Sequence, residues 1–131
     1  MTGGRSFTLR DVNVYRPYPD EIPWELLEAG GAAAEQADAD LMRVAKLDGE
    51  AVAVYQLREL DPTRYELVAL AVAPDYRRRG LGRWLLGHAI GIAESRGARE
   101  IWVRRAQLKG LFLRIGFKAE NEALVLRLTP E

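Results

Sequence analysis

One stretch decides the fold of this chain: Val72-Ala73-Pro74-Asp75-Tyr76-Arg77-Arg78-Arg79-Gly80-Leu81-Gly82. It joins the end of a β-branched strand to a helix through an arginine-rich turn. Gly80 and Gly82 let the backbone approach a ligand without a Cβ in the way, and the first amides of the following helix are unpaired donors at the positive end of its dipole. The arginines add charged, fork-shaped donors suited to phosphate oxygens. The junction therefore predicts a phosphate-binding loop.

Two common phosphate loops do not match this stretch. A nucleotide P-loop needs a Lys and a Ser or Thr after its last glycine, and neither follows Gly82. A dinucleotide-binding fingerprint needs a third glycine where Leu85 stands. What remains is R-x-x-G-x-G directly after a strand, formed by Arg77, Gly80 and Gly82. Three arginines alone would fit a solvated basic surface, but the strand, the glycine spacing and the helix together favour a ligand site.

The R-x-x-G-x-G stretch resembles the acyl-coenzyme A pyrophosphate loop of the GNAT N-acetyltransferase superfamily. The residues after it agree with this resemblance. Apolar positions from Leu81 onward follow the three-and-four spacing of a helix with one buried face, which should end at Gly97. A buried strand at 100–103, a helix at 107–115 closing on Gly116-Phe117, and a last strand at about 123–128 follow. The resemblance covers residues 42–128, with specific motifs only over 66–117.

The resemblance implies an α/β (α+β) fold, the GNAT acyl-CoA N-acyltransferase fold. Its sheet would be mixed, mostly antiparallel and of six or seven strands, with helices on both faces, and residues 1–131 would form a single domain. The first half of the chain predicts further elements on its own signals. These are a partly alternating strand at 7–15, helices at 23–29 and 31–39, a hairpin of 41–47 and 50–60 around Asp48-Gly49, a turn at 61–63, and a strand at 65–73.

Glu66 is the candidate general base. Strict alternation along residues 66–72 would place Glu66, Val68, Leu70 and Val72 on one face of a strand. A lone carboxylate among branched apolar groups would be partly desolvated, which raises its pKa toward the range useful for a base. The resemblance supports this role, because several GNAT enzymes carry a basic glutamate at this motif position. The alternative is that Glu66 only meets solvent or Arg64 at the start of the strand.

The resemblance also assigns the cofactor-binding residues. The main chain of Leu70, Ala71 and Val72 would pair with pantetheine, and an amide near Val72 would polarise the thioester carbonyl. The pyrophosphate would be held by Arg77, Arg78, Arg79, Gly80, Leu81 and Gly82. The implied co-substrate is acetyl-CoA, and no metal is expected.

Phe112 departs from the family pattern. It stands four residues before Gly116, where many members carry the tyrosine that protonates the leaving sulfur, and Arg105 stands near a position that is often asparagine. Either the sulfur leaves as a thiolate, which suits a thiol with an ordinary pKa of about 8.5, or the chain binds acyl-CoA without efficient turnover. In both cases the resemblance would place Phe112 beside the cofactor sulfur.

Composition and charge limit the cellular location and the partners that we expect for this protein. The chain has no cysteine, no run of eighteen apolar residues and no signal-like start, so we expect a cytoplasmic protein without membrane contact. Residues 1–62 hold 6 Lys/Arg and 12 Asp/Glu, whereas residues 63–131 hold 13 and 7. A basic half for an anionic cofactor and an acidic half for a cationic amine fit an amine acetyltransferase, although each half could equally just solvate its own surface. Outside the loop no interleaved basic and aromatic stripe indicates nucleic acid.

The predicted function is therefore acetyl transfer from acetyl-CoA to a primary amine of a small-molecule or peptide acceptor, by direct attack. The alternative is an acyl-CoA-binding regulatory module with weak or no catalysis. A homodimer is compatible with either function. His88, on the apolar stripe of the helix, is expected to be a core or boundary histidine bonded to a backbone carbonyl rather than a catalyst.

Overall fold

The computed structural model describes residues 8–30, 38–104 and 109–128. Its centre is a seven-stranded sheet with the strand order β1-β2-β3-β4-β5-β7-β6. β4 and β5 pair in parallel, and every other pair of neighbours is antiparallel. The strands are β1 (Asn13–Tyr15), β2 (Met42–Leu47), β3 (Glu50–Asp61), β4 (Arg64–Val72), β5 (Glu100–Val103), β6 (Lys118–Glu120) and β7 (Ala123–Arg127). The predicted mixed, mostly antiparallel sheet is confirmed.

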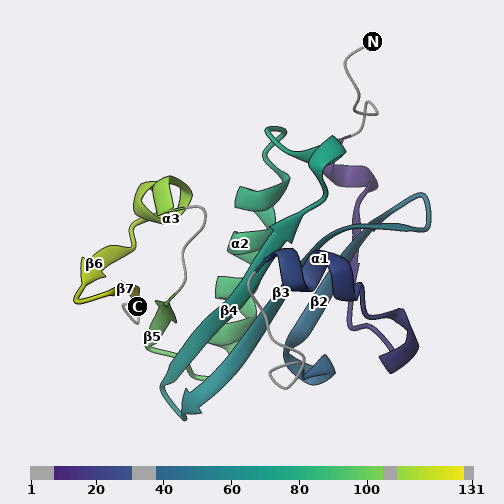
Figure 1. Ribbon diagram of the computed structural model, residues 1–131. Coiled ribbons are helices and arrows are strands. Elements are labelled where there is room, and N and C mark those ends of the chain that lie inside the picture. Colours follow the sequence, from purple (N-terminus) through teal and green to yellow (C-terminus); the bar gives the residue numbers. More distant parts are fainter. Residues whose placement is uncertain (1–7, 31–37, 105–108, 129–131) are drawn as a thin grey trace.

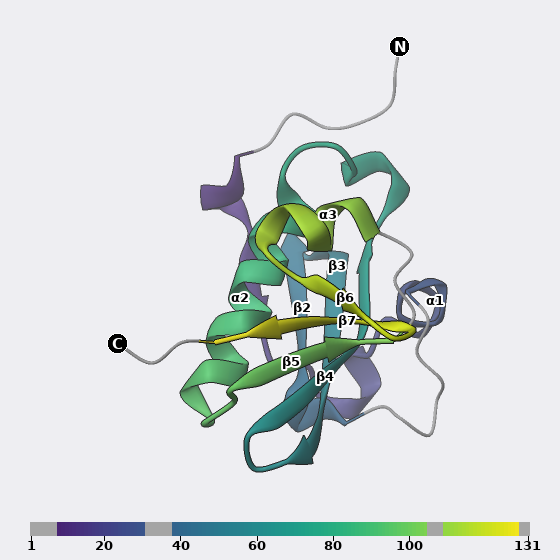
Figure 2. The ribbon, with the colours of Figure 1, turned by 90° about the vertical axis from the view of Figure 1, so that its left-hand side faces the viewer.

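Helices cover both faces of this sheet (Figure 1). The α-helices are α1 (Trp24–Ala29), α2 (Leu81–Ser95) and α3 (Lys109–Ile115). α1 inserts Leu27 into one core cluster, while the buried stripe of α2 lies in the other cluster with the opposite sheet face. β5, β7 and β6 extend the sheet beyond β4, with α3 beside them (Figure 2). In the described part of the chain, no helix has the length and apolar character needed to cross a bilayer.

The hairpin and the long helix form where the sequence predicts them. Asp48 and Gly49 both have positive φ, 51° and 79°, which suits the tight turn between β2 and β3. α2 begins directly after Gly80 and ends at Ser95, with Arg96 as its C-cap. The local signals at these elements are strong, because each turn or cap requires a specific residue type.

The middle of β4 differs from the prediction. Gln56 lies opposite Ala69 and Leu57 lies opposite Leu67, so Val68 is an extra residue in the β3–β4 ladder, a β-bulge. The bulge resets the alternation of β4. Tyr65, Leu67, Leu70 and Val72 belong to the core cluster under α2, whereas Ala69 and Ala71 pack under α1. The expectation that Glu66 shares a face with Leu70 and Val72 is therefore wrong.

Two further differences concern the first strand and the far edge of the sheet. The described part of the predicted 7–15 strand starts with a 3-10 turn, Leu9–Asp11, because the Asp11 carboxylate accepts hydrogen bonds from the Thr8 amide and hydroxyl. Only Asn13–Tyr15 is a strand. β6 was not predicted, since three residues are too few to show a period. Phe7, most of the 31–39 helix and residues 107–108 lie outside the described residues.

Candidate functional site

β4 and β5 form a fork at the centre of the sheet. They pair at Arg64–Glu100, Tyr65–Ile101 and Glu66–Trp102, and the ladder stops there. Beyond Glu66, β4 continues along β3, while β5 continues along β7. From residue 67 to residue 72, the edge of β4 that faces β5 therefore forms no ladder with β5. Such an edge offers backbone donors and acceptors to an extended ligand.

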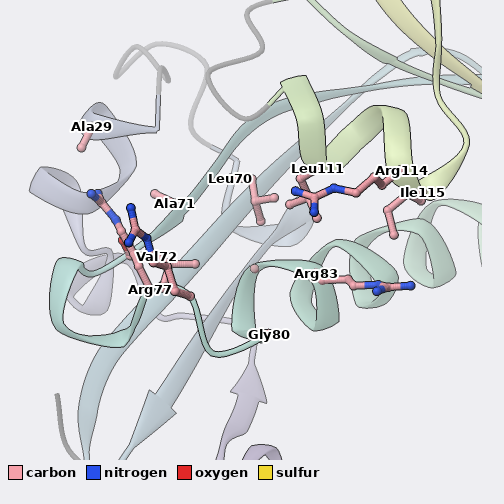
Figure 3. A pocket seen from close by; sticks show the side chains of 12 residues that line it. Ala29, Leu70, Ala71, Val72, Arg77, Gly80, Arg83, Leu111, Arg114 and Ile115 are labelled. Atoms are coloured by element: carbon pink, nitrogen blue, oxygen red, sulfur yellow. The ribbon is translucent and has the colours of Figure 1, made fainter.

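A cleft of about 630 Å³ lies at the open end of this fork (Figure 3). Its size suits a small-molecule or cofactor site. One wall is β4, the other is α3, and the start of α2 closes the base. The lining residues are Ala29, Leu70, Ala71, Val72, Arg77, Arg78, Gly80, Gly82, Arg83, Leu111, Arg114 and Ile115.

The start of α2 presents free amides at the cleft. Gly80 is the N-cap in a left-handed conformation, with φ of 82°, and it has no side chain to cap the helix. The first helical hydrogen bond runs from the Trp84 amide to the Gly80 carbonyl over 3.0 Å. The amides of residues 81–83 therefore precede the helical ladder, at the positive end of the helix dipole. Arg78 also has a positive φ, 63°, a conformation that is unfavourable for a residue with a Cβ.

Four arginines line the cleft, and none of the described residues that line it is a carboxylate. Arg77 lies at one end beside Val72, and its Nε donates to the Val72 carbonyl over 2.9 Å, which fixes the guanidinium next to the strand. Arg83 of α2 and Arg114 of α3 lie at the other end (Figure 3). The described lining of the cleft is therefore positively charged, with cations at both ends.

The structure places most, but not all, of the predicted cofactor residues in the cleft. Residues 70–72, Arg77, Arg78, Gly80 and Gly82 line it, whereas Arg79 and Leu81 do not. The Leu81 side chain is in the core, so only its main chain could reach a ligand. Sequence reasoning missed Arg83 and Arg114, because neither belongs to the R-x-x-G-x-G pattern and only the packing of α3 beside α2 brings them together.

Glu66 lies at the apex of the fork, in the last pair of β4 with β5. Its side chain is only 7% exposed. Oε1 accepts a hydrogen bond from Arg58 Nη2 at 2.5 Å, directly across the β3–β4 ladder, and lies 4.0 Å from Arg104 Nε. The prediction of a lone carboxylate among apolar groups is therefore wrong, and Arg64 instead pairs with Asp61. The hydrogen bonds and ion pairs of the described residues leave Oε2 available.

Phe112 lies in the core beneath α3. It is 3% exposed and packs edge-on against Phe117, with 5.2 Å between ring centroids. Its neighbours Leu111 and Ile115 face the cleft. A position of Phe112 beside the cofactor sulfur stays a prediction. Arg105 lies outside the described residues.

Known proteins resemble this chain in sequence and in fold. A family model described as "Acetyltransferase (GNAT) family" matches residues 7–117. A [ribosomal protein bS18]-alanine N-acetyltransferase of Salmonella typhimurium is 42% identical over 65 residues, which are 47% of this chain and 42% of that protein. A streptothricin acetyltransferase of Streptomyces lavendulae is 31% identical over 106 residues, 76% of this chain and 54% of that protein. The chain thus spans about half the length of these relatives, or less.

A similar fold occurs in a GNAT family acetyltransferase from Elizabethkingia anophelis, solved with acetyl-CoA bound. The TM-score is 0.74 at 20% sequence identity, and the match covers 90% of this chain and 99% of that one. At this identity the comparison shows a shared fold.

Proposed function

Because the chain belongs to the acetyltransferase (GNAT) family, we propose that it transfers an acetyl group from acetyl-CoA to a primary amine. The observation that best supports this proposal is that the unpaired edge of β4 leads directly into the arginine-lined cleft at the start of α2. An extended ligand with amide groups and a polyanionic end would fit this arrangement, because its amides could pair with the β4 edge and its anionic end could bind in the cleft. Acetyl-CoA is such a ligand.

Each part of the cleft has a role in this proposal. The amides of residues 81–83 and the arginine side chains bind the pyrophosphate. The pantetheine lies along residues 70–72 of β4 and pairs with their main chain. This places the thioester beyond residue 70, toward the apex of the fork, where a main-chain amide of the unpaired β4 edge polarises the carbonyl. An amide at Val72 itself would instead lie at the pyrophosphate end of the cleft.

The reaction proceeds by direct attack. The amine nitrogen bonds to the thioester carbon, the carbon–sulfur bond breaks, and the sulfur leaves as a thiolate that is protonated afterwards. Glu66 takes the amine proton through Oε2, directly or through a water molecule, while Arg58 holds Oε1 in place. The chain contains no cysteine, and the proposal requires no covalent acyl-enzyme.

The acceptor is proposed only as a primary amine. The names of the two sequence relatives point to different acceptors, a ribosomal protein and streptothricin. At the apex of the fork two arginines, Arg58 and Arg104, surround one carboxylate. This charge balance favours an acceptor with an anionic group close to its amine over a polycation.

CoA release with a panel of amines tests the proposal. The panel contains amino acids, short peptides with free N-termini and polyamines, and acetyl-CoA affinity is measured in parallel. Release of CoA that depends on an amine supports the enzyme. Tight acetyl-CoA binding without release for every amine would instead support the regulatory module, which the buried Phe112 in place of a tyrosine keeps as the second candidate.

A further inference from the structure

A second pocket, of about 600 Å³, lies at the β1 edge of the sheet, away from the β4–β5 fork. It is formed by β1, the residues that follow β1, β2 and the middle of α2. The acyl-CoA chemistry proposed above does not use it. Its polar lining includes Arg16, Arg43 and His88, and Tyr18 at its surface is 73% exposed.

Arg43 is a buried cation that forms no ion pair with any carboxylate of the described residues. It is 9% exposed, and its Nη1 donates to the carbonyls of Asp40 and Met42, at 2.8 and 2.7 Å. Burial lowers the pKa of Arg43, and the charges of Arg16 and Arg96 lower it further. Among the described residues, the carboxylate that acts on Arg43 is that of Asp40, which pairs with Arg16 at 3.1 Å and with Arg96 at 3.4 Å. Within the part of the chain that the structure describes, three guanidinium groups therefore lie around one carboxylate, which leaves a local excess of positive charge.

His88 adds a further donor to this pocket. Its Nδ1 lies 2.8 Å from the hydroxyl of Tyr55, which is fully buried, so the expected bond to a backbone carbonyl is not the one formed. Burial raises the pKa of Tyr55 far above its usual value, so the hydroxyl keeps its proton. A buried hydroxyl needs an acceptor, and Nδ1 supplies it. Burial and the charge of Arg43 lower the pKa of His88, and a neutral ring whose Nδ1 accepts from the Tyr55 hydroxyl carries its proton on Nε2.

We propose that this pocket binds the oxyanion of a small organic molecule, held by Arg43, Arg16 and the Nε2–H of His88. All three groups are donors, so the ligand must supply acceptors and negative charge. The apolar walls beside them, including Val14 and Ile92, suit an organic body rather than a bare inorganic ion. A carboxylate and a phosphate share the required chemistry. The site is independent of acetyl-CoA, because it lies at the β1 edge of the sheet and not at the β4–β5 fork.

The single histidine of the chain makes this proposal directly testable. Long-range ¹H–¹⁵N NMR of the imidazole reports on His88 alone. In the protein without added ligand, we expect the proton on Nε2. A ring with its proton on Nδ1 would overturn the donor arrangement. Benzoate and inorganic phosphate are then titrated at constant ionic strength against sodium chloride, and at least one of them is expected to shift the Nε2–H signal saturably.

Variants locate the bound anion. Arg43→Met is expected to weaken binding by at least about tenfold, because it removes the buried charge. The matched control is Arg64→Met, which removes an arginine paired with Asp61 in the β3–β4 turn and should leave the affinity unchanged. If Arg43→Met does not fold, the more exposed Arg16→Gln should weaken binding about two- to fivefold. Saturation by benzoate alone identifies a carboxylate site and by phosphate alone a phosphate site.

Two outcomes would overturn the proposal. One is the absence of a saturable His88 shift with both probes. The other is equal affinity in the native protein and in the folded arginine variants, which would place the anion elsewhere, for example at the start of α2. Acetyl-CoA binding is measured separately on the same samples, so failure here is distinguishable from failure of the proposed acetyl transfer.

Discussion

Gly82 offers the sharpest test of the acyl-CoA cleft. A Cβ at this position would lie 3.6 Å from Val72 Cγ2 and 3.9 Å from Leu111 Cδ2, which are ordinary van der Waals distances. Val72 belongs to the β4 wall and Leu111 to the α3 wall. The methyl group of Gly82→Ala would therefore stand between the two walls of the cleft without disturbing either of them. The protein should fold normally, while a ligand at the helix start should lose its room.

The expected magnitudes separate these two effects. Replacing a helical glycine by alanine stabilises a helix by up to about 1 kcal/mol, so the melting temperature of Gly82→Ala should stay the same or rise. Forcing one extra methyl group into a packed contact costs about 1–3 kcal/mol. This corresponds to a loss of acetyl-CoA affinity of roughly 5- to 150-fold. Gly82→Asp should abolish binding, because it adds a carboxylate beside phosphate.

Gly87→Ala is the matched control. Gly87 lies in the same helix, and a Cβ there would meet no described atom within 4 Å apart from its chain neighbours and the backbone of its own helix. This variant should gain a similar helix stabilisation and keep the native affinity. Calorimetric titration with acetyl-CoA and thermal denaturation measure both quantities. Native affinity in a folded Gly82→Ala protein would show that no ligand approaches the start of α2, and the cleft assignment would be wrong.

Three further predictions concern single side chains. Glu66→Gln should lower turnover by roughly 10²-fold with acetyl-CoA affinity kept and a smaller loss at high pH, where more amine is neutral; native rates at pH 7 would remove Glu66 as the base. Phe112→Tyr should lower the free energy of unfolding by about 1–3 kcal/mol, because its hydroxyl would be buried beside Phe117; native stability with faster turnover would instead put position 112 at the sulfur. The lowered pKa of His88 means that the unfolded chain takes up its proton first, so urea unfolding should show stability falling as the pH drops from 7.5 to 5.5, through the unfolded value of 6.5. His88→Gln should remove that slope, and an unchanged slope would mean that another group titrates.

The parts of the fold that the sequence predicts have local signals. Asp48-Gly49 requires a tight turn, the apolar stripe from Leu81 requires a helix, and the helix stop requires Gly97. The Val68 bulge has no such signal. β4 is buried on both faces, so its residues are apolar at nearly every position, and an extra residue does not interrupt any alternation. A period of two cannot locate a bulge in a strand that shows no period.

The residues of the candidate site likewise include some with a local sequence signal and others that only the tertiary structure brings together. The loop residues that line the cleft have a local signal, because the turn needs glycine and a phosphate ligand would need arginine within a few positions. Arg58, Arg83 and Arg114 come from three separate elements, and only the tertiary structure brings them to the fork or the cleft. The sequence alone presents Glu66 as an isolated carboxylate, because nothing near it in the chain shows that Arg58 lies directly opposite it in the β3–β4 hairpin.

The β-bulge at Val68 affects both the edge of β4 proposed for pantetheine and the position of the proposed base, Glu66. β4 stays paired with β5 up to Glu66, and the extra residue Val68 follows two positions later. A bulge bends its strand and increases the local twist, which accounts for the point at which β4 leaves β5 and the fork opens. The same insertion turns Glu66 to the sheet face opposite Leu70 and Val72. One irregularity therefore opens the edge proposed for pantetheine and sets the proposed base on the α1 face of the fork, so that an amine approaching Glu66 meets the thioester from the side away from α2.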